Sequence, residues 1–294
     1  MKIALYNSFN GHFEVIGYIM ELFSKDNNSI TLYHNNGDRF RYIDYFEELF
    51  GKINKISIDD FKNSYKNYDI IFFITMTIDI PSYISDIKDK TYGILHVSSR
   101  RSKYINNYIS LYPYKKNKTV QKLLKTNNFN YTFPFYNAPS AKNFSDRKYI
   151  LQIGVLWDND DDLKNFQKNI NYEIIYFSRK SKSFSSQLDC RSRDMFLMSK
   201  YLQNSLFILG RKTWHYPYAY TGSLTLSFSF NVPIILPEFK QKEYNVPCVT
   251  FKENYSELID YINNINVDDY NNLLKKMNDV KEKEIQHNRE NFNL

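Results

Sequence analysis

The chain is short of cysteine, glycine and proline: its 294 residues include two cysteines, eight glycines and eight prolines. Cys190 and Cys248 are too few for a framework of several disulfides and lack the spacing of metal-ligand pairs, so we expect a reducing compartment. No segment reaches the roughly 18 apolar residues that a membrane span needs. The apolar part of the start, residues 3–6, is too short for a signal peptide, and we expect a soluble cytoplasmic protein.

The abundant residues are those with A/T-rich codons: lysine, asparagine and isoleucine are frequent, and there are 26 tyrosines and 23 phenylalanines. This bias indicates the genome of an A/T-rich microbe or of a large DNA virus. In the viral case the compartment is the host cytoplasm. Aromatic richness is therefore poor evidence for a carbohydrate site.

The net charge of +7, from 39 basic and 32 acidic residues, is unevenly spread. Residues 100–125 contain no acidic side chain, and their tyrosines are interleaved with the basic residues Arg100, Arg101, Lys103, Lys115, Lys116, Lys118, Lys122 and Lys125. Such a patch suits nucleic acid, an anionic membrane or a phosphorylated acceptor, and the alternative is a solvated basic face. We expect a peripheral contact with an anionic membrane and no nucleic acid partner.

Short apolar runs alternate with segments of helical spacing in the first half of the chain. Strands are predicted at 2–6, 30–33, 69–74 and 92–97, and helices at 13–23, 42–50 and 59–65. This alternation is typical of a parallel sheet with helices on both faces.

Residues 131–147 contain two prolines and have no helical period, which indicates a connection between domains. The alternation then restarts, with strands predicted at 149–155 and 172–177 and helices at 161–168 and 193–203. The end of the chain is predicted to be helical over 255–265 and again after Asp268 or Asp269, either of which would cap the last helix.

The most informative stretch is residues 205–237. A buried strand at 205–209 leads into Gly210, Arg211 and Lys212, an aromatic loop follows, and a second buried strand is predicted at 232–236. A parallel pair of this kind needs a crossover helix, here one that starts near Thr221. The loop and the helix N-terminus then lie together at the carboxyl edge of the sheet.

That edge favours an anion. The N–H groups of Gly222, Ser223 and Leu224 would carry the positive end of the helix dipole, and Arg211 and Lys212 would add formal charge. The sequence therefore predicts a phosphate or diphosphate ligand here, flanked by His215 and Tyr218.

The order of strand, basic residues, aromatic loop, glycine-containing helix start and Val-Pro-Ile-Ile resembles the donor half of glycosyltransferases of the GT-B fold. The resemblance implies an α/β protein of two facing Rossmann-like domains with parallel sheets. Residues 1–140 would form the acceptor-side domain, 141–267 the nucleotide-sugar-binding domain, and 268–294 a helix that crosses back to the first domain. It further implies a nucleotide-diphosphate sugar as donor, a UDP-sugar by our expectation, bound at Gly154, Thr221 and the phosphate site above.

The first predicted strand leads into Asn10, Gly11 and His12, which resembles the Gly-His loop of inverting GT-B enzymes. The resemblance implies that His12 takes a proton from the acceptor hydroxyl, with Asn10 and Gly11 on the acceptor side. An imidazole titrates near neutral pH and so suits this work. His96, at a strand end, is expected to line the acceptor side or to be an alternative base. For both histidines a hydrogen-bonding role without catalysis is the alternative.

The acidic run at 158–162 is a candidate metal site. Asp158 and Asp160 fit the Asp-x-Asp letters of metal-dependent glycosyltransferases of another fold. The run precedes a predicted helix, however, where acidic residues interact favourably with the dipole. We expect capping here, and neither a metal nor another cofactor for the protein.

Three functions remain open from the sequence. The first is an inverting glycosyltransferase that moves a sugar to a hydroxyl of a glycan, lipid or protein. The second is a nucleotide-sugar epimerase of the same fold, and the third is a non-catalytic protein that binds sugar or nucleic acid.

Overall fold

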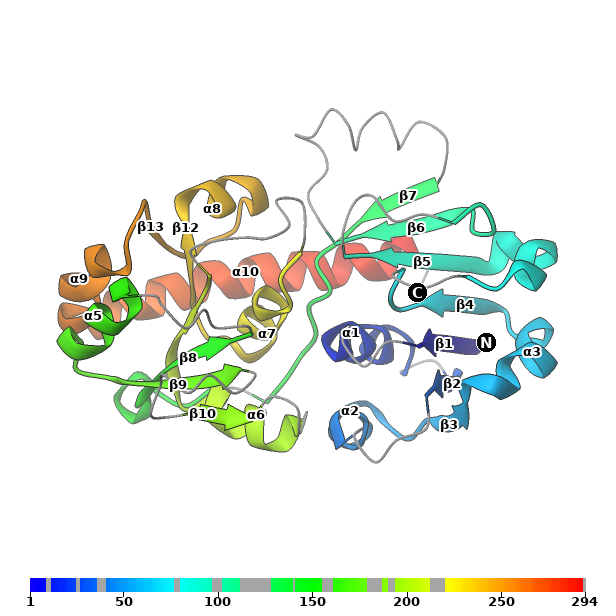
Figure 1. The fold of residues 1–294 in the computed structure, drawn as a ribbon, viewed down its shortest axis with the longest axis horizontal. Helices are drawn as coiled ribbons and strands as arrows, with labels where there is room; N and C mark the ends of the chain where they lie inside the picture. Colours follow the sequence, from blue (N-terminus) through cyan, green and yellow to red (C-terminus); the bar gives the residue numbers. More distant parts are fainter. Residues whose placement is uncertain are drawn as a thin grey trace. The chain divides into compact units, whose positions relative to one another are not determined.

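A computed structural model describes the chain except for residues 9–11, 25–26, 36–40, 77–79, 97–101, 112–127, 140, 155–160, 179–186, 190–193, 212–219 and 293–294. The chain divides into two compact units. Unit 1 comprises Met1–Tyr136, Tyr216–Gly222 and Glu284–Leu294, and unit 2 comprises Asn137–His215 and Ser223–Lys283. Each unit has its own parallel sheet (Figure 1).

Unit 1 is built on a seven-stranded sheet in the order β3-β2-β1-β4-β5-β6-β7, with every neighbouring pair parallel. Its strands are β1 (Lys2–Asn7), β2 (Ser29–His34), β3 (Asn54–Ser57), β4 (Ile70–Phe73), β5 (Thr91–Leu95), β6 (Asn107–Ser110) and β7 (Asn128–Tyr131). Its longer helices are α1 (Phe13–Phe23) and α2 (Arg41–Phe50). The short helical pieces are η1 (Ile58–Asp60), α3 (Phe61–Ser64), η2 (Tyr65–Asn67) and η3 (Ser82–Lys90).

The apolar runs of the sequence account for the central strands of this sheet. Ile3, Ala4 and Leu5 in β1 and Ile71 and Phe72 in β4 have no exposed surface. Parallel strands covered on both faces are expected to be continuously apolar in this way. The segment predicted as one helix over 59–65 is instead divided between η1, α3 and η2.

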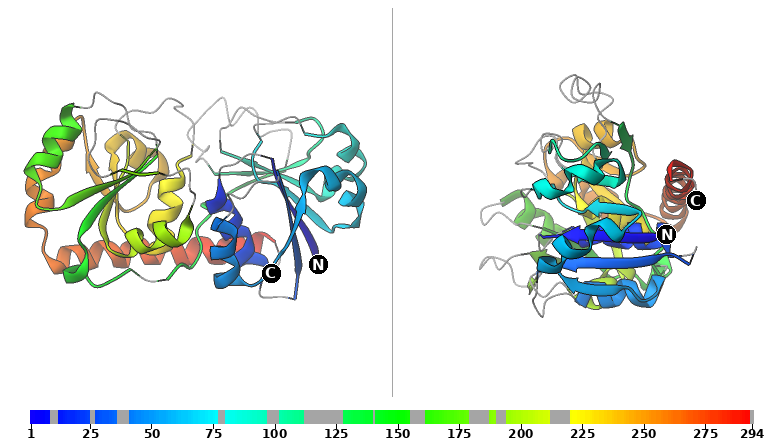
Figure 2. Two further views of the ribbon diagram at one scale, coloured as in Figure 1. Left: turned by 60° about the horizontal axis from the view of Figure 1, so that its bottom comes forward. Right: turned by 90° about the vertical axis from the view of Figure 1, so that its right-hand side faces the viewer.

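Unit 2 has a six-stranded parallel sheet in the order β10-β9-β8-β11-β12-β13. Its strands are β8 (Tyr149–Ile153), β9 (Glu173–Ser178), β10 (Gln187–Asp189), β11 (Ser205–Leu209), β12 (Ile234–Pro237) and β13 (Val249–Phe251). Its helices are η5 (Phe144–Asp146), α5 (Asp161–Asn169), α6 (Met195–Gln203), α7 (Gly222–Phe230, whose first residue is counted with unit 1), α8 (Glu238–Tyr244), η7 (Tyr255–Leu258) and α9 (Ile259–Asn264). Figure 2 shows the twist of both sheets.

The last helix, α10 (Val267–Asn291), is shared: its residues up to Lys283 are counted with unit 2 and those from Glu284 with unit 1. In unit 1 the Asn288 side chain bonds to Thr132 and donates to the carbonyl oxygen of Phe133. Beyond the helix end, Phe292 packs edge-on against Phe23 and Phe72. Within the described part of the chain, no helix is both long and apolar enough to cross a bilayer.

The prediction that Asp268 or Asp269 caps α10 is wrong. Asn266 is the cap: its Oδ1 accepts from the N–H of Asp269 at 2.9 Å, and its Nδ2 donates to the Asp269 carboxylate at 2.7 Å. The two aspartates lie inside the first turn, where they complement the helix dipole. The prediction considered the two aspartates alone, whereas the residue just outside the helix is the asparagine.

Replacing Asn266 with alanine should lower the free energy of unfolding by about 1 kcal/mol, because two N-terminal hydrogen bonds are lost. The matched control is Asn272→Ala, at an exposed position inside the same helix. Since alanine favours a helix interior, that change should not destabilise the protein. Urea unfolding of both variants checks this, and equal losses would contradict the assignment of the cap.

Candidate functional site

In each sheet there is one point from which successive strands are added on opposite sides. In unit 1 it lies between β1 and β4, and in unit 2 between β8 and β11. Open α/β sheets bind ligands outside the carboxyl ends of the strands at such a point. The residues that follow these four strands are therefore the first candidates for a site.

At this point in unit 2, the structure brings together Gly154 and Arg211. Gly154 follows β8 with a φ of 113°, a left-handed conformation that favours glycine. Its N–H donates to the carbonyl oxygen of Phe177 at 2.9 Å. A Cβ atom at this position would lie 2.6 Å from Nη2 of Arg211, so the guanidinium lies directly over the glycine backbone.

The Arg211 guanidinium is a partly buried cation. Burial lowers its pKa below the usual value, and the nearby Tyr255 partly opposes this effect. Among the residues that the structure describes, none forms an ion pair or hydrogen bond with it. A desolvated charge without a partner is costly, and an anionic ligand would remove that cost.

A chain of contacts fixes the turn that carries Arg211. The Tyr255 hydroxyl donates to the carbonyl oxygen of Gly210 at 3.1 Å. The Asp162 carboxylate accepts from the N–H groups of Tyr255 at 2.6 Å and Ser256 at 3.3 Å. Asp162 therefore caps η7. Asp158 and Asp160 lie outside the described residues, so the expectation of capping instead of metal binding stays a prediction for them.

Gln152 is a further polar residue at this edge that the sequence reasoning did not single out. It lies on β8 between Leu209 and Tyr176 of the neighbouring strands, two residues before Gly154. Its side chain is buried, and Oε1 has no hydrogen-bond partner in the described structure. A buried acceptor without a described partner is a further candidate for a contact with a ligand at this edge.

The remaining predicted donor residues are only partly described. Ser223 and Leu224 lie in the first turn of α7 and Thr221 precedes it, so the predicted helix start is confirmed and phosphate binding there stays a prediction. Lys212, His215 and Tyr218 lie outside the described residues, as do Asn10 and Gly11 on the acceptor side. Of the basic patch at 100–125, only residues 102–111 are described, so membrane contact stays a prediction.

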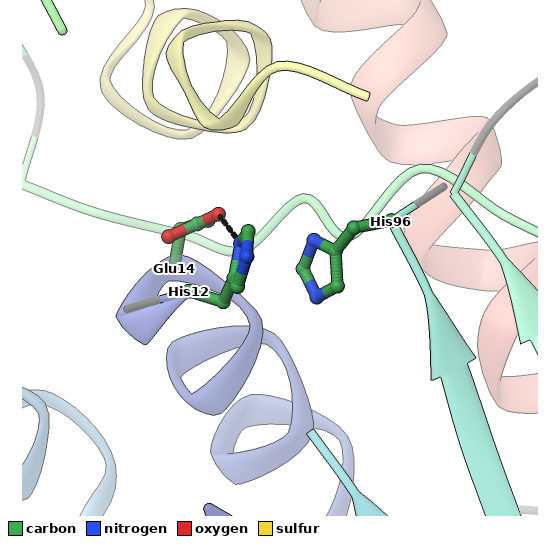
Figure 3. A group of neighbouring side chains, drawn as sticks. All are labelled: His12, Glu14 and His96. Atoms are coloured by element: carbon green, nitrogen blue, oxygen red, sulfur yellow. Dashed lines mark ion pairs between the residues drawn. The ribbon is translucent and has the colours of Figure 1, made fainter. Parts of the chain in front are cut away.

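In unit 1, three side chains meet: His12, Glu14 and His96 (Figure 3). His12 precedes α1 in the left-handed region with a φ of 60°, and its carbonyl oxygen accepts from the N–H of Val15. Its Nδ1 lies 3.5 Å from Oε1 of Glu14. Nδ1 of His12 therefore faces a carboxylate, which leaves Nε2 as the nitrogen with a lone pair when the ring is neutral.

His96 follows β5 and is buried against His12. The two rings are in contact, with centroids 3.5 Å apart and planes 33° apart. Nε2 of His96 lies 2.9 Å from the carbonyl oxygen of Ile74 and donates to it. Burial and the neighbouring His12 lower the pKa of His96 well below its usual value, so this imidazole is neutral near pH 7.

Gly222 lies close to the carboxylate of Glu14. A Cβ atom on Gly222 would lie 2.7 Å from Oε1 of Glu14, so a side chain at Gly222 would displace the carboxylate. Glu14 is almost fully buried. The sequence predicted His12 but gave no signal for Glu14, which follows it by two residues in an otherwise apolar helix start.

No protein-family model and no curated protein matches the chain. Solved structures match its fold. HepE of Anabaena with UDP-glucose is 10% identical, with a TM-score of 0.62 over 99% of each chain. A mutant of T4 phage BGT with UDP-glucose is 13% identical, with a TM-score of 0.56 over 99% of this chain and 98% of that one. UDP-GlcNAc 2-epimerase from Neisseria meningitidis is 11% identical, with a TM-score of 0.53 over 95% and 94%.

These similarities show the fold: the chain has the GT-B glycosyltransferase fold, as the sequence resemblance implied. Identities of 8–13% among the glycosyltransferase neighbours do not extend the likeness to a reaction.

Because the sequence predicts a diphosphate ligand at this site, we expect Gly154→Ala to weaken binding of UDP as the probe and to lower the melting temperature. The left-handed backbone costs about 1–3 kcal/mol for a residue with a side chain, and the new methyl group would displace Arg211. Gly51→Ala is a matched control, since Gly51 has a φ of 101° and nothing within 4 Å of a Cβ. It should lose similar stability and keep UDP affinity. Equal UDP affinity in both variants would contradict a role for the Gly154–Arg211 contact.

Proposed function

We propose that this protein is a glycosyltransferase that moves a sugar from a UDP-sugar donor to a hydroxyl group of a glycan, lipid or protein, with inversion at the anomeric carbon. The single observation that carries the proposal is the partly buried guanidinium of Arg211, which lies over the backbone of Gly154 and pairs with none of the described residues. It lies where an α/β sheet binds its ligand. Neighbouring structures of the same fold contain UDP or UDP-glucose.

Arg211 would bind the diphosphate of the donor. Negative charge grows on the diphosphate as its bond to the sugar breaks, and a fixed guanidinium stabilises that charge in the transition state. The N-terminal N–H groups of α7 at Ser223 and Leu224 would add to this stabilisation. These groups make a metal ion unnecessary for the leaving group, and we propose transfer without one.

His12 would be the general base. Glu14 faces its Nδ1, so Nε2 accepts the proton of the acceptor hydroxyl as the oxygen forms its bond to the anomeric carbon. The bond from that carbon to the diphosphate breaks at the same time, and its electron pair leaves with UDP. His12 is 28% exposed on its side chain, whereas His96 is buried and Nδ1 of His96 has almost no accessible surface. His12 is therefore the better placed of the two histidines.

An epimerase is the second candidate, because an epimerase of UDP-GlcNAc shares the fold. The two functions differ in their products: transfer releases free UDP, while epimerisation returns an intact nucleotide sugar. Incubation with UDP-glucose, UDP-galactose and UDP-GlcNAc, each with and without a panel of sugar and lipid acceptors, separates them by chromatography. Acceptor-dependent release of UDP supports transfer, and an isomerised UDP-sugar without UDP release would overturn it.

A further inference from the structure

The cluster of His12, Glu14 and His96 has the composition of a metal site. It contains two imidazoles and a carboxylate, and one ligand atom from each lies within 4.8 Å of the other two. Glu14 and His96 are buried and His12 is partly buried. Among the described residues, no other group of three such side chains comes this close.

Nδ1 of His96 is oriented as in a metal ligand. The proton of this neutral ring is on Nε2, which donates to the carbonyl oxygen of Ile74, so Nδ1 presents a lone pair. That atom is buried and has no hydrogen-bond partner in the described structure. Metal-binding histidines donate their other ring nitrogen to a carbonyl or carboxylate in the same way. A buried acceptor with no donor indicates that something else binds it.

The spacing of the other two groups also fits. Two ligands of a tetrahedral ion at bond lengths of about 2.1 Å lie about 3.4 Å apart. Nδ1 of His12 and Oε1 of Glu14 are 3.5 Å apart. Figure 3 shows the His12 ring between Glu14 and His96. A rotation of this ring would break its contact with the His96 ring and let both histidines bind the same ion.

We propose that His12, Glu14 and His96 bind one transition-metal ion of the Zn²⁺ class, with water as the fourth ligand. Imidazole and carboxylate ligands suit zinc, and three protein ligands leave one position for solvent. The effect of the ion follows from the proposed function: bound zinc would inhibit sugar transfer. Metal on Nδ1 of His12 places the ring proton on Nε2, and that nitrogen then cannot accept the proton of the acceptor.

The test is titration of the untagged, chelator-treated protein with Zn²⁺ by calorimetry and with Co²⁺ by visible absorption. We expect one ion per chain and the intense d–d bands of tetrahedral cobalt. His96→Phe keeps an aromatic ring in contact with the His12 ring but removes the ligand atom Nδ1. Glu14→Gln keeps the shape of the side chain but removes the charge of the carboxylate. Each should weaken binding by at least about 100-fold, because loss of even an outer-shell partner of a metal ligand costs about 10- to 100-fold.

His287→Ala, at an exposed position on α10, is the control and should bind as the unmodified protein does. Thermal melts without metal show whether each variant is folded. Absence of 1:1 binding, octahedral cobalt spectra, or unchanged affinity in folded His96→Phe or Glu14→Gln would each overturn the site. If zinc binds as expected but turnover of UDP-glucose is unaffected, the metal site stands and the role of His12 as base fails instead.

Discussion

Arg211→Ala is expected to weaken binding of UDP by about 10- to 100-fold, because charge-assisted hydrogen bonds are worth about 1.5–3 kcal/mol. The same variant should melt a few degrees higher than the unmodified protein. The guanidinium is partly desolvated, burial lowers its pKa, and no described residue pairs with it, so its removal relieves the folded state. Opposite effects on binding and stability are typical of a residue retained for function.

Calorimetry with UDP and thermal unfolding without ligand measure the two effects. Arg289→Ala is the control, since it removes one positive charge from the last turn of α10. It should leave UDP affinity unchanged, which excludes an effect of net charge. If Arg211→Ala binds UDP normally, or if it melts well below the unmodified protein, Arg211 is a structural residue and the donor site is elsewhere.

His12→Ala is expected to reduce transfer by about 10²- to 10⁴-fold, the usual contribution of a positioned general base. Binding of UDP should be unaffected, because the proposed donor site at Arg211 and Gly154 belongs to unit 2 and His12 belongs to unit 1. The loss should therefore be in kcat, with little change in KM for the donor.

Glu14→Gln tests whether Glu14 orients His12 and stabilises its protonated form. The amide is the same size, so it fits beside Gly222, but it lacks the charge that stabilises the imidazolium. We expect a smaller loss of kcat than in His12→Ala and unchanged donor affinity. Steady-state kinetics with the acceptor found by the product screen checks both. Normal turnover in His12→Ala would exclude His12 as the base and return attention to His96.

The sequence predicted those parts of the fold that depend on local pattern. The helical period of residues 13–23 predicts α1 with the bounds that the structure has, and the apolar runs predict β1, β2, β4, β5, β8, β9, β11 and β12. The missed strands are short or polar; β3, for example, reads Asn-Lys-Ile-Ser and is half exposed. Such a segment becomes a strand because its neighbour β2 offers hydrogen bonds, which a local pattern does not contain.

The candidate site likewise contains residues that the sequence predicted and contacts that it did not. Arg211 and His12 follow predicted strands and Gly154 lies near the end of one, and parallel topology brings residues at such positions to the carboxyl edge of their own sheet. The contacts of Glu14 with Gly222, of Asp162 with Tyr255, and of His96 with Ile74 join residues at least 22 positions apart. No spacing rule connects them. They depend on tertiary packing, as does the open acceptor on Gln152.

Binding of a nucleotide diphosphate at Arg211 in unit 2 can be measured by thermal unfolding against uridine, UMP, UDP and UDP-glucose, in EDTA. A ligand that binds only the folded protein raises its melting temperature by mass action. We expect an upward shift of the melting temperature with UDP and UDP-glucose, little shift with uridine, and loss of the shift in Arg211→Ala. A shift that is equal for uridine and UDP, or one that persists in Arg211→Ala, would contradict diphosphate binding at Arg211.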